Sequence, residues 1–475
     1  MTLKLSGPLG ALACLLLTGA IAHGAEPISL GSRLELFVDD FLIDQLSGGE
    51  LRLHPPTPKD VAIVFDEPWE GNTSAYVTVF QDGPLHRMYY RGTNYDRATK
   101  TSSDEVTCYA ESRDGIHWSK PRLGLFAFEG SKANNIVWAG IGTHNFTPFK
   151  DGNPDGAPEA RYKALARHDR GLYAFQSSDG IHWSVMRDSP VITKGAFDSQ
   201  NLAFWDPVRE RYVEFHRGFR DGVRDIMTCT STDFLNWTEP DWIDQGDAPK
   251  EHLYTNAITA YFRAPQWFVG FPKRFQPSRQ PADHPDPGVS DGVFMTSRDG
   301  AHWHRWPEAF IRPGLQPERW VNRNNMTAWG LVLTKSDVAG VPDEISLYSS
   351  EGYYVDNCRL RRYTLRQDGF VSVHAPHSGA ELITKPLVFD GTRLVINFST
   401  SAVGSVRVEM QDATGKPLAG FTLDDSAEIF GDAIEQTVRW SAGRDVSRLA
   451  GVPVRLRFVL HDADLYSLRF APAEN

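Results

Sequence analysis

Three carboxylic acid side chains stand shortly before an asparagine that opens an apolar run: Glu70, Asp198 and Glu251. Hydrolysis of a glycosidic bond requires one protonated carboxyl group and one ionised carboxylate flanking the bond. We therefore pair Glu70 with Asp198 as candidate catalytic groups, with Glu251 as a third carboxylate and Asp39 and Asp40 in reserve. The alternative for each is a role in a turn, a cap or a surface ion pair.

Polar and aromatic residues at the same positions are candidates for substrate binding. They are Trp69, His144, Gln200, His252, Trp320, Arg323 and Asn324. The arginine can hold a carboxylate ionised or bind an anionic sugar group. The two tryptophans either stack on sugar faces or pack in the core. The two histidines can orient a substrate or contact a central ion.

Several other chemistries lack their sequence signatures. The chain has neither a nucleophile-elbow motif nor a glycine-rich phosphate loop. Outside the first 25 residues its cysteines are Cys108, Cys229 and Cys358, with no CxxC pair and no histidine at zinc-ligand spacing. We expect buried, unreactive thiols, no metal site and no cofactor, although a central structural cation is compatible with the pattern.

A seven-residue box, S-x-D-G-x-H-W, occurs three times, at 112–118, 177–183 and 297–303. A fourth copy at 231–237 has lost its glycine, and 349–353 is a degraded fifth. Asp-Gly favours a tight turn, the serine and aspartate oxygens can accept bonds from nearby backbone N–H groups, and the tryptophan can pack beneath. We expect the boxes to be structural rather than catalytic.

A second repeat precedes the boxes. Apolar runs opened by Asn72, Asn145, Asn201, Asn256 and Asn325 precede the five boxes in register, with a further strand candidate between each run and its box. Five units of three or four short strands predict a five-bladed β-propeller over residues 30–375. The mostly apolar residues 34–38 are the expected strand that helps to close the ring beside the last blade.

The repeat ends near residue 375. Residues 376–475 contain five nearly alternating apolar segments separated by Asp-Gly, Thr-Gly and Ala-Gly turn signals, and no box. This pattern predicts an antiparallel β-sandwich that covers or supports the propeller. The predicted fold class is therefore all-β in two domains.

Length and charge agree with this division. The chain has 475 residues, too many for one ordinary domain, with 60 acidic and 49 basic side chains and a net charge of −11. Because binding to phosphates requires a clustered basic face, this balance argues against a nucleic-acid partner. The sequence does not indicate an oligomeric state.

Residues 1–25 have the organisation of a signal peptide. Lys4 supplies a positive start, an apolar run follows, and the small residues at 20–22 form a cleavage pattern. No later segment reaches the roughly 18 apolar residues of a membrane span. We expect an exported, soluble protein, periplasmic or extracellular, with lipid anchoring at Cys14 as the alternative.

The boxes, the count of five and the two-domain plan resemble the glycoside hydrolase family 32 and 43 superfamily, which includes fructosidases, arabinanases and xylosidases. Similar boxes occur in sialidases, which usually have six blades. The resemblance implies a hydrolase whose pocket lies on the propeller axis, lined by the starts of the innermost strands. Residues 38–41 match one catalytic element of the family loosely.

Three functions follow from these patterns. The first is a secreted glycoside hydrolase that cleaves an extracellular polysaccharide or oligosaccharide by carboxylate acid/base catalysis. The second is a polysaccharide lyase, in which a tyrosine or histidine is the base and Arg323 or Lys250 neutralises a uronate. The third is a non-catalytic carbohydrate-binding propeller, which needs the aromatic residues but no carboxylate pair.

Overall fold

The computed structural model describes residues 26–281, 284–285, 287–355 and 357–473. The expected signal peptide, 1–25, lies outside the described residues. Within them, no helix has the length and apolar character needed to cross a membrane. The helices among the described residues are short 3-10 turns: η1 (Thr143–Asn145), η2 (Pro158–Ala160), η3 (Pro317–Trp320) and η4 (Ser447–Leu449).

Antiparallel strands form five four-stranded sheets between residues 57 and 365. The first contains β6 (Ala75–Asp82), β7 (Leu85–Gly92), β10 (Val106–Ser112) and β11 (Ile136–Trp138). The second contains β12 (Thr147–Lys150), β13 (Tyr162–His168), β14 (Gly171–Ser177) and β15 (Ser184–Val185). The third contains β16 (Leu202–Asp206), β17 (Arg211–Arg220), β18 (Val223–Ser231) and β19 (Asp241–Trp242). The fourth contains β21 (Thr259–Tyr261), β22 (Ala264–Gly270), β25 (Met295–Ser297) and β26 (Trp303–Arg305), and the fifth contains β27 (Val332–Thr334), β28 (Glu344–Glu351), β29 (Arg359–Leu365) and β5 (Thr57–Val64).

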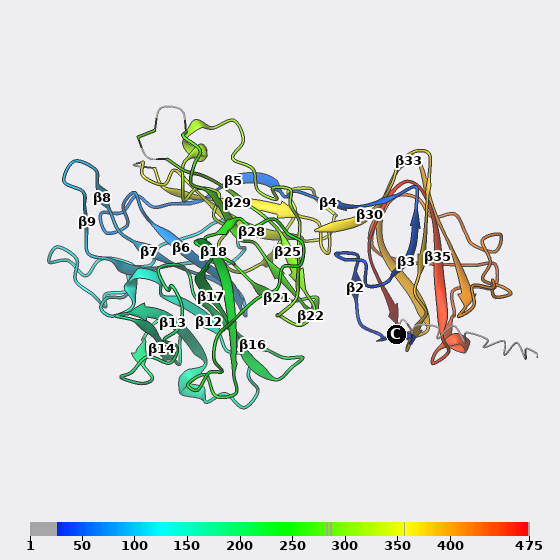
Figure 1. Ribbon diagram of the computed structural model, residues 1–475, viewed down its shortest axis with the longest axis horizontal. Helices are drawn as coiled ribbons and strands as arrows, with labels where there is room; N and C mark the ends of the chain where they lie inside the picture. The colour runs from blue at the N-terminus through cyan, green and yellow to red at the C-terminus, as the bar shows by residue number, and fades with distance from the viewer. Residues whose placement is uncertain (1–25, 282–283, 286, 356, 474–475) are drawn as a thin grey trace, which may run out of the picture.

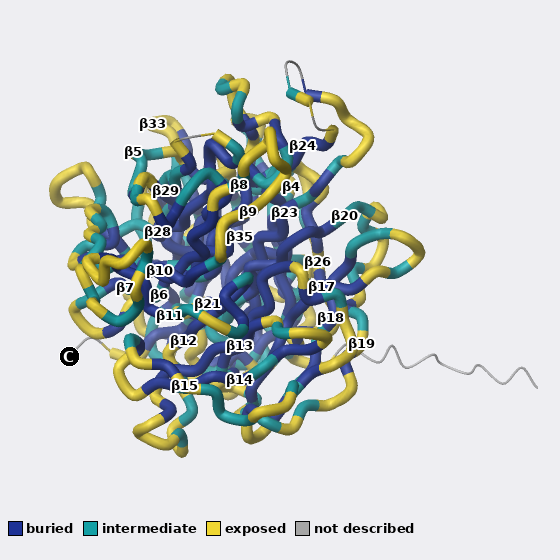
Figure 2. Tube along the Cα trace, turned by 90° about the vertical axis from the view of Figure 1, so that its left-hand side faces the viewer, coloured by how far each residue is buried: buried dark blue, intermediate teal, exposed yellow. Residues whose placement is uncertain are grey.

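Two smaller sheets extend this framework. β20 (His252–Leu253), β23 (Lys273–Gln276) and β24 (Val289–Gly292) form a three-stranded sheet next to the fourth unit. β8 (Tyr95–Asp96) and β9 (Thr101–Ser102) form a hairpin in the first unit. Figure 2 shows the buried residues concentrated in the strands and the exposed ones in the loops between them.

The first strand of each sheet lies innermost. β6 contacts both β12 and β27, and β12 contacts β16. A hollow of about 320 Å³ is lined from all five units, by residues that include Thr78, Phe149, Phe204, Thr259 and Trp329. The five sheets therefore surround one axis. Four of the five asparagine-led runs continue into the inner strands β6, β12, β16 and β21, whereas the run at 325–329 ends before β27.

The strand that completes the last sheet differs from the prediction. β5 pairs with β29, whereas β2 (Glu35–Leu36), inside the predicted closing strand 34–38, pairs with the C-terminal strand β35 (Val454–Ala471). β1 (Ile28–Gly31), β3 (Ile43–Ser47) and β4 (Glu50–Leu53) also pair with C-terminal strands. The small sheets thus begin near residue 57, not at residue 30, because the preceding strands pair with the C-terminal sheet. Phe37 is buried in the C-terminal core, while Leu36 and Val38 pack with residues of the fourth and fifth sheets.

The C-terminal part is built on one ten-stranded sheet that bends around this core. To β1–β4 it adds β30 (Val371–Ala375), β31 (Ala380–Thr384), β32 (Leu387–Phe389), β33 (Arg393–Asp412), β34 (Asp432–Thr437) and β35. The long strands β33 and β35 pair along most of their length. Figure 1 shows them with β3 on the right, beside the small sheets.

Each of the first four boxes forms a turn that follows the third strand of its sheet. In the first box, the serine oxygen of Ser112 accepts a bond from Gly115 N at 2.9 Å, and Asp114 Oδ1 accepts bonds from the backbone N of Ile116 and His117 at 2.8 Å. The other boxes repeat these contacts. Their predicted structural role is confirmed.

The predicted fifth box is wrong. Residues 349–353 lie at the end of β28, a second strand, whereas the other boxes follow third strands. The turn at the corresponding place in the fifth sheet follows β29 and retains only Asp368-Gly369 of the box. The loss of its serine and tryptophan hid this copy in the sequence.

Candidate active site

Charged and aromatic side chains from all five units meet at the end of the axis opposite the boxes. Glu105 directly precedes β10, which ends at the box serine Ser112, and Arg224 is near the start of β18, which ends at the box serine Ser231. We call this group the axial cluster. It consists of Tyr76, Arg91, Glu105, His144, Asp198, Arg217, Arg224, Tyr254, Lys273, Arg323 and Tyr353.

His144 stands between two carboxylates of the axial cluster. Its Nε2 lies 2.8 Å from Asp198 Oδ1, and its Nδ1 lies 2.8 Å from Glu105 Oε1. One imidazole ring and two hydrogen bonds therefore separate the two carboxylates, and both ring nitrogens of His144 are engaged. Asp198 is the most open of the three, with 52% of its side chain exposed.

These contacts set the charges of the three groups. The hydrogen bond from His144, reinforced by Arg217 and Arg323, holds the pKa of Asp198 well below its usual range. Burial opposes ionisation of Glu105, but the bond from His144 and the charge of Arg91 lower its pKa overall. Burial likewise opposes the charge of His144, but its two carboxylate partners raise its pKa. The site thus holds a proton on the imidazole between two ionised acids.

Five cations surround these groups: Arg91, Arg217, Arg224, Lys273 and Arg323. Four of them face the ring of Tyr254, with Lys273 Nζ at 4.0 Å and Arg217 Cζ at 4.9 Å from its centroid. The fifth, Arg91, lies 3.5 Å from Glu105. Aromatic faces therefore hold these cations in place without neutralising them.

Lys273 is fully buried in this group. Its Nζ donates to Asn322 Oδ1 at 2.9 Å, and it makes no ion pair with a carboxylate among the residues that the structure describes. Burial, followed by repulsion from Arg323, Arg224 and Arg217, lowers its pKa well below the usual lysine value. The charged form of its amine is therefore disfavoured at this place.

Two cluster residues occupy backbone conformations that are unfavourable for side-chain-bearing residues. Tyr76 has φ 53° and Arg323 has φ 70°. Asn324 supports the second of these, because its Oδ1 accepts a bond from Tyr353 N at 3.0 Å while Arg323 Nη1 donates to Tyr353 Oη at 2.7 Å. Such conformations cost of order 1–3 kcal/mol each and gather at functional sites.

Of the predicted catalytic residues, Glu70 does not join the axial cluster. It is fully buried, bonded to Tyr90 and paired with Lys120 Nζ at 2.6 Å. Burial raises its pKa in spite of Lys120. The turn at Gly71, with φ 75°, directs Glu70 into the core between the first and fifth sheets.

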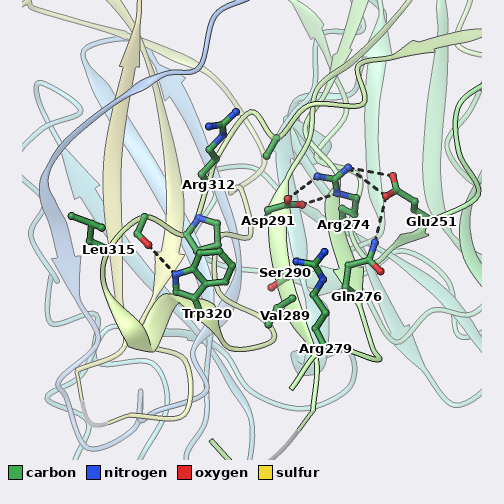
Figure 3. A pocket seen from close by; sticks show the side chains of 13 residues that line it. Glu251, Arg274, Gln276, Arg279, Val289, Ser290, Asp291, Arg312, Leu315 and Trp320 are labelled. Atoms are coloured by element: carbon green, nitrogen blue, oxygen red, sulfur yellow. Dashed lines mark hydrogen bonds and ion pairs between the residues drawn. The ribbon is translucent and has the colours of Figure 1, made fainter. Parts of the chain in front are cut away.

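Glu251 lies beside a separate cavity of about 590 Å³ (Figure 3). Arg305 Nη1 approaches its carboxylate to 2.7 Å and Arg274 Nη1 to 3.4 Å, so that its charge is neutralised. Trp320, whose Nε1 donates to Gly314 O at 2.8 Å, is exposed on the other side of this cavity. Neither residue contacts Asp198.

Asp39 and Asp40 lie next to the C-terminal sheet. Asp39 pairs with Arg298 at 3.1 Å, and the backbone carbonyl of Asp40 accepts bonds from Ile43 N and Lys385 Nζ. They follow β2, which pairs with β35 rather than with a strand near the axis. They therefore take no part in the axial cluster.

The remaining candidates have supporting contacts. Trp69 is buried and donates to Asn135 Oδ1 at 2.6 Å, so it is a core residue. Gln200 is buried and donates to Val77 O at 3.1 Å. His252 accepts a bond from Arg224 N at 3.2 Å, and burial together with the charge of Arg224 lowers its pKa.

The remaining candidate groups are the cysteines and the side chains that could bind a metal ion. Cys108, Cys229 and Cys358 are buried and unpaired, as expected. Within the described ranges, no three His, Cys, Asp or Glu side chains are grouped so that they could hold a metal ion.

Comparisons with known proteins give structural neighbours only. No protein-family model and no curated protein matches the chain. Many of the solved structures that align with it are glycoside hydrolases. A glycosyl hydrolase from Bacteroides ovatus has 15% identity and a TM-score of 0.41, with 68% of this chain and 94% of that chain covered.

Two other structures align over more of this chain. An exo-β-1,3-galactanase from Phanerochaete chrysosporium has 10% identity and a TM-score of 0.38, covering 86% of this chain and 100% of its own. The Bombyx mori GH32 β-fructofuranosidase has 9% identity and a TM-score of 0.38, covering 89% and 95%. At such identities the likeness identifies no substrate and no catalytic residue of this chain.

Sequence reasoning missed Glu105 and four of the five cations. Glu105 precedes a third strand rather than an asparagine-led run. The missed signal for the cations is a basic residue near the end of the second strand, as in Arg91-Gly92 and Arg217-Gly218. Lys273 follows β22, the second strand of the fourth sheet, after a two-residue break.

Proposed function

We propose that this chain is an exported glycoside hydrolase that cleaves a polysaccharide or oligosaccharide in the periplasm or outside the cell. In this proposal residues 1–25 are a removable signal peptide, the five small sheets are the blades of a five-bladed β-propeller, and the C-terminal strands form a β-sandwich. The common axis and the separate C-terminal core support this division.

The observation that carries the proposal is the row Glu105–His144–Asp198. Asp198 is the base that takes a proton from the attacking water, because it is ionised and open. His144 is the acid: with Nδ1 held by Glu105, its Nε2 proton, shared with Asp198 in the free site, passes to the leaving oxygen as the bond from that oxygen to the anomeric carbon breaks. Glu105 is a positioning residue that orients the imidazole and favours its charged form.

The hydrogen bond between Asp198 and His144 allows the site to reset itself. After one turnover Asp198 carries a proton and His144 has lost one. Transfer along the 2.8 Å contact restores both groups, because the carboxyl is the stronger acid of the two. No redox cofactor is needed for this cycle.

A polysaccharide lyase is the second candidate, and the arginines around Tyr254 favour it. In a lyase a basic side chain removes the proton on the carbon next to a uronate carboxylate, while the arginines stabilise the charge that develops. The bond to the leaving oxygen then breaks, His144 protonates that oxygen, and a carbon–carbon double bond remains. The hydrolase adds water and leaves no double bond.

The test is a panel of neutral and acidic glycans incubated with the mature chain. New reducing ends without ultraviolet absorbance support a hydrolase, whereas reducing ends with absorbance of an unsaturated product identify a lyase. Binding without new reducing ends would instead assign the protein to the non-catalytic class. His182→Asn is the matched control, since His182 pairs with Asp179 at 2.7 Å in an exposed box.

A further inference from the structure

The axial cluster has an excess of positive charge that the described residues leave unbalanced. Four arginines and the buried amine of Lys273 face two carboxylates, Glu105 and Asp198, in a chain whose net charge is −11. Burying a charge is costly unless it is paired. A compensating negative charge on the substrate would balance this site.

The individual contacts locate the excess. Arg224, Lys273 and Arg323 make no ion pair with any carboxylate in the part of the chain that the structure describes, although each lies beside the ring of Tyr254. Arg217 has Asp198 alone, at 3.9 Å. The uncompensated cations are thus gathered around a single ring.

Donors at the same place are unsatisfied. The hydroxyl of Tyr76 and the Nε atoms of Arg91, Arg217, Arg224 and Arg323 are buried without a hydrogen-bond partner among the described residues. Buried polar groups are normally bonded, so a group of unpartnered donors around one point needs an acceptor. The half-exposed carboxylate of Asp198 marks the side from which a ligand can reach the cluster.

We infer that the axial cluster recognises an acidic saccharide and that Arg224, Lys273 and Arg323 hold its anionic group. This inference rests on the proposed function and names the substrate class of that site. The group is an oxyanion carried by the sugar, either the carboxylate of a uronic acid or a sulfate ester. Arginine forks bind both, through two parallel N–H donors.

An anion placed among Arg217, Arg224 and Arg323 also favours the charged form of Lys273. Burial, followed by repulsion from these three arginines, lowers the pKa of Lys273, and a negative group offsets the repulsive part of that shift.

The experiment is calorimetric titration of the mature chain with glucuronate, galacturonate, glucose 6-sulfate, glucose and galactose at two salt concentrations. We expect one or both kinds of acidic sugar to bind at least about tenfold more tightly than the neutral sugars, as one charge-assisted hydrogen bond predicts. The affinity should fall as salt rises. The uronates and the sulfate ester distinguish the two sources of the oxyanion.

Two variants test the named residues. Arg224→Gln and Lys273→Met should each weaken acidic binding by about tenfold or more and leave neutral sugars unaffected. Lys335→Gln is the control, because it removes one charge from an exposed pair with Asp343. If Lys273→Met does not fold, Arg224→Gln, at a half-exposed residue, still tests whether the cluster binds the acidic group.

The outcomes separate this inference from the proposed function. Equal binding of acidic and neutral sugars, or no binding of either, overturns the inference, as does unchanged acidic binding in Arg224→Gln. Cleavage of neutral glycans with no preference for acidic ones would contradict the inference but would agree with the proposed hydrolase. Tight acidic binding without cleavage of any glycan supports the inference and removes the hydrolase.

Discussion

His144 Nε2 lies 2.8 Å from Asp198 Oδ1, although the two residues belong to different units. The second unit supplies the imidazole from η1 and the third supplies the carboxylate from the segment before β16. Their contact joins adjacent units across the axis. The chemistry of the site depends on this contact.

Asp198→Asn should abolish most of the activity and leave the fold intact. The amide cannot accept a proton from water, and loss of a general base typically lowers kcat by about 10²–10⁴-fold. Steady-state kinetics and thermal unfolding of the same preparation measure both quantities. Asp40→Asn, at an exposed aspartate outside the cluster, is the control. Full activity in Asp198→Asn would remove this residue from the mechanism.

Glu70→Gln should lower stability rather than activity. The substitution removes the buried charge that faces Lys120 and weakens the contact with Tyr90. Because Lys120 keeps Asp66 as a partner at 2.9 Å, we expect a loss of about 2 kcal/mol in the free energy of unfolding. Urea denaturation measures this loss. A stable variant with no activity would return Glu70 to the catalytic group.

Glu70 and Asp198 illustrate the limit of what the sequence predicts. Both precede an asparagine-led run, so periodicity identified the correct end of the inner strands for each. The direction of each side chain depends on local turns, such as the one at Gly71, and on partners distant in sequence, such as Lys120. Composition and spacing carry neither kind of information.

The strand that completes the fifth sheet shows the same limit at the level of the fold. Residues 34–38 and β5 are both short N-terminal segments with apolar side chains, and each pairs with a strand about 300 or more residues away. Local pattern predicts that such segments are strands but not which distant edge each one joins. The boxes and the inner strands were predictable because they repeat.

His144 should make stability depend on pH in a defined direction. Since its pKa is raised in the folded state, its stabilising contribution is fully present below the unfolded value near 6.5, roughly, and is lost as pH rises through the folded pKa. The difference in unfolding free energy between the wild type and His144→Gln should therefore be largest in mild acid and shrink on the alkaline side. Denaturant titrations from pH 5 to 9, roughly, measure it, with His182→Gln as a surface histidine for comparison. A difference that grows with pH would contradict the raised pKa.

The box aspartates should contribute to stability without contributing to catalysis. Asp179→Ala removes the acceptor for Ile181 N and His182 N, both at 2.8 Å, which should cost about 1 kcal/mol, as the loss of a helix cap does. Burial opposes ionisation of Asp179, but these bonds lower its pKa overall, so its contribution is lost as pH falls below the unfolded value near 3.9, roughly. Unfolding curves give the cost, and kcat per folded molecule should be unchanged. A fall in kcat without a change in stability would assign the box a direct role.

Arg298→Met should weaken the junction between the small sheets and the C-terminal sheet. The guanidinium lies 3.7 Å from the ring centroid of Phe41 and 3.6 Å from that of Trp267, and it bonds to Glu35 and Asp39. Methionine keeps part of the packing but leaves the buried carboxylate of Glu35 without one of its two cations.

We expect a loss of about 3 kcal/mol, the lower end of the range for breaking a buried ion pair. Denaturant unfolding, together with limited proteolysis of the segment between β4 and β5, measures it. Arg113→Met is the matched control, because Arg113 occupies the same place in the first box and is exposed. Equal stability of the two variants would show that Arg298 does not hold the two parts together. A loss of stability in Arg298→Met alone, with proteolytic cleavage appearing before residue 57, would show that this arginine holds the junction together. It would also identify Asp39, its partner, as a structural residue.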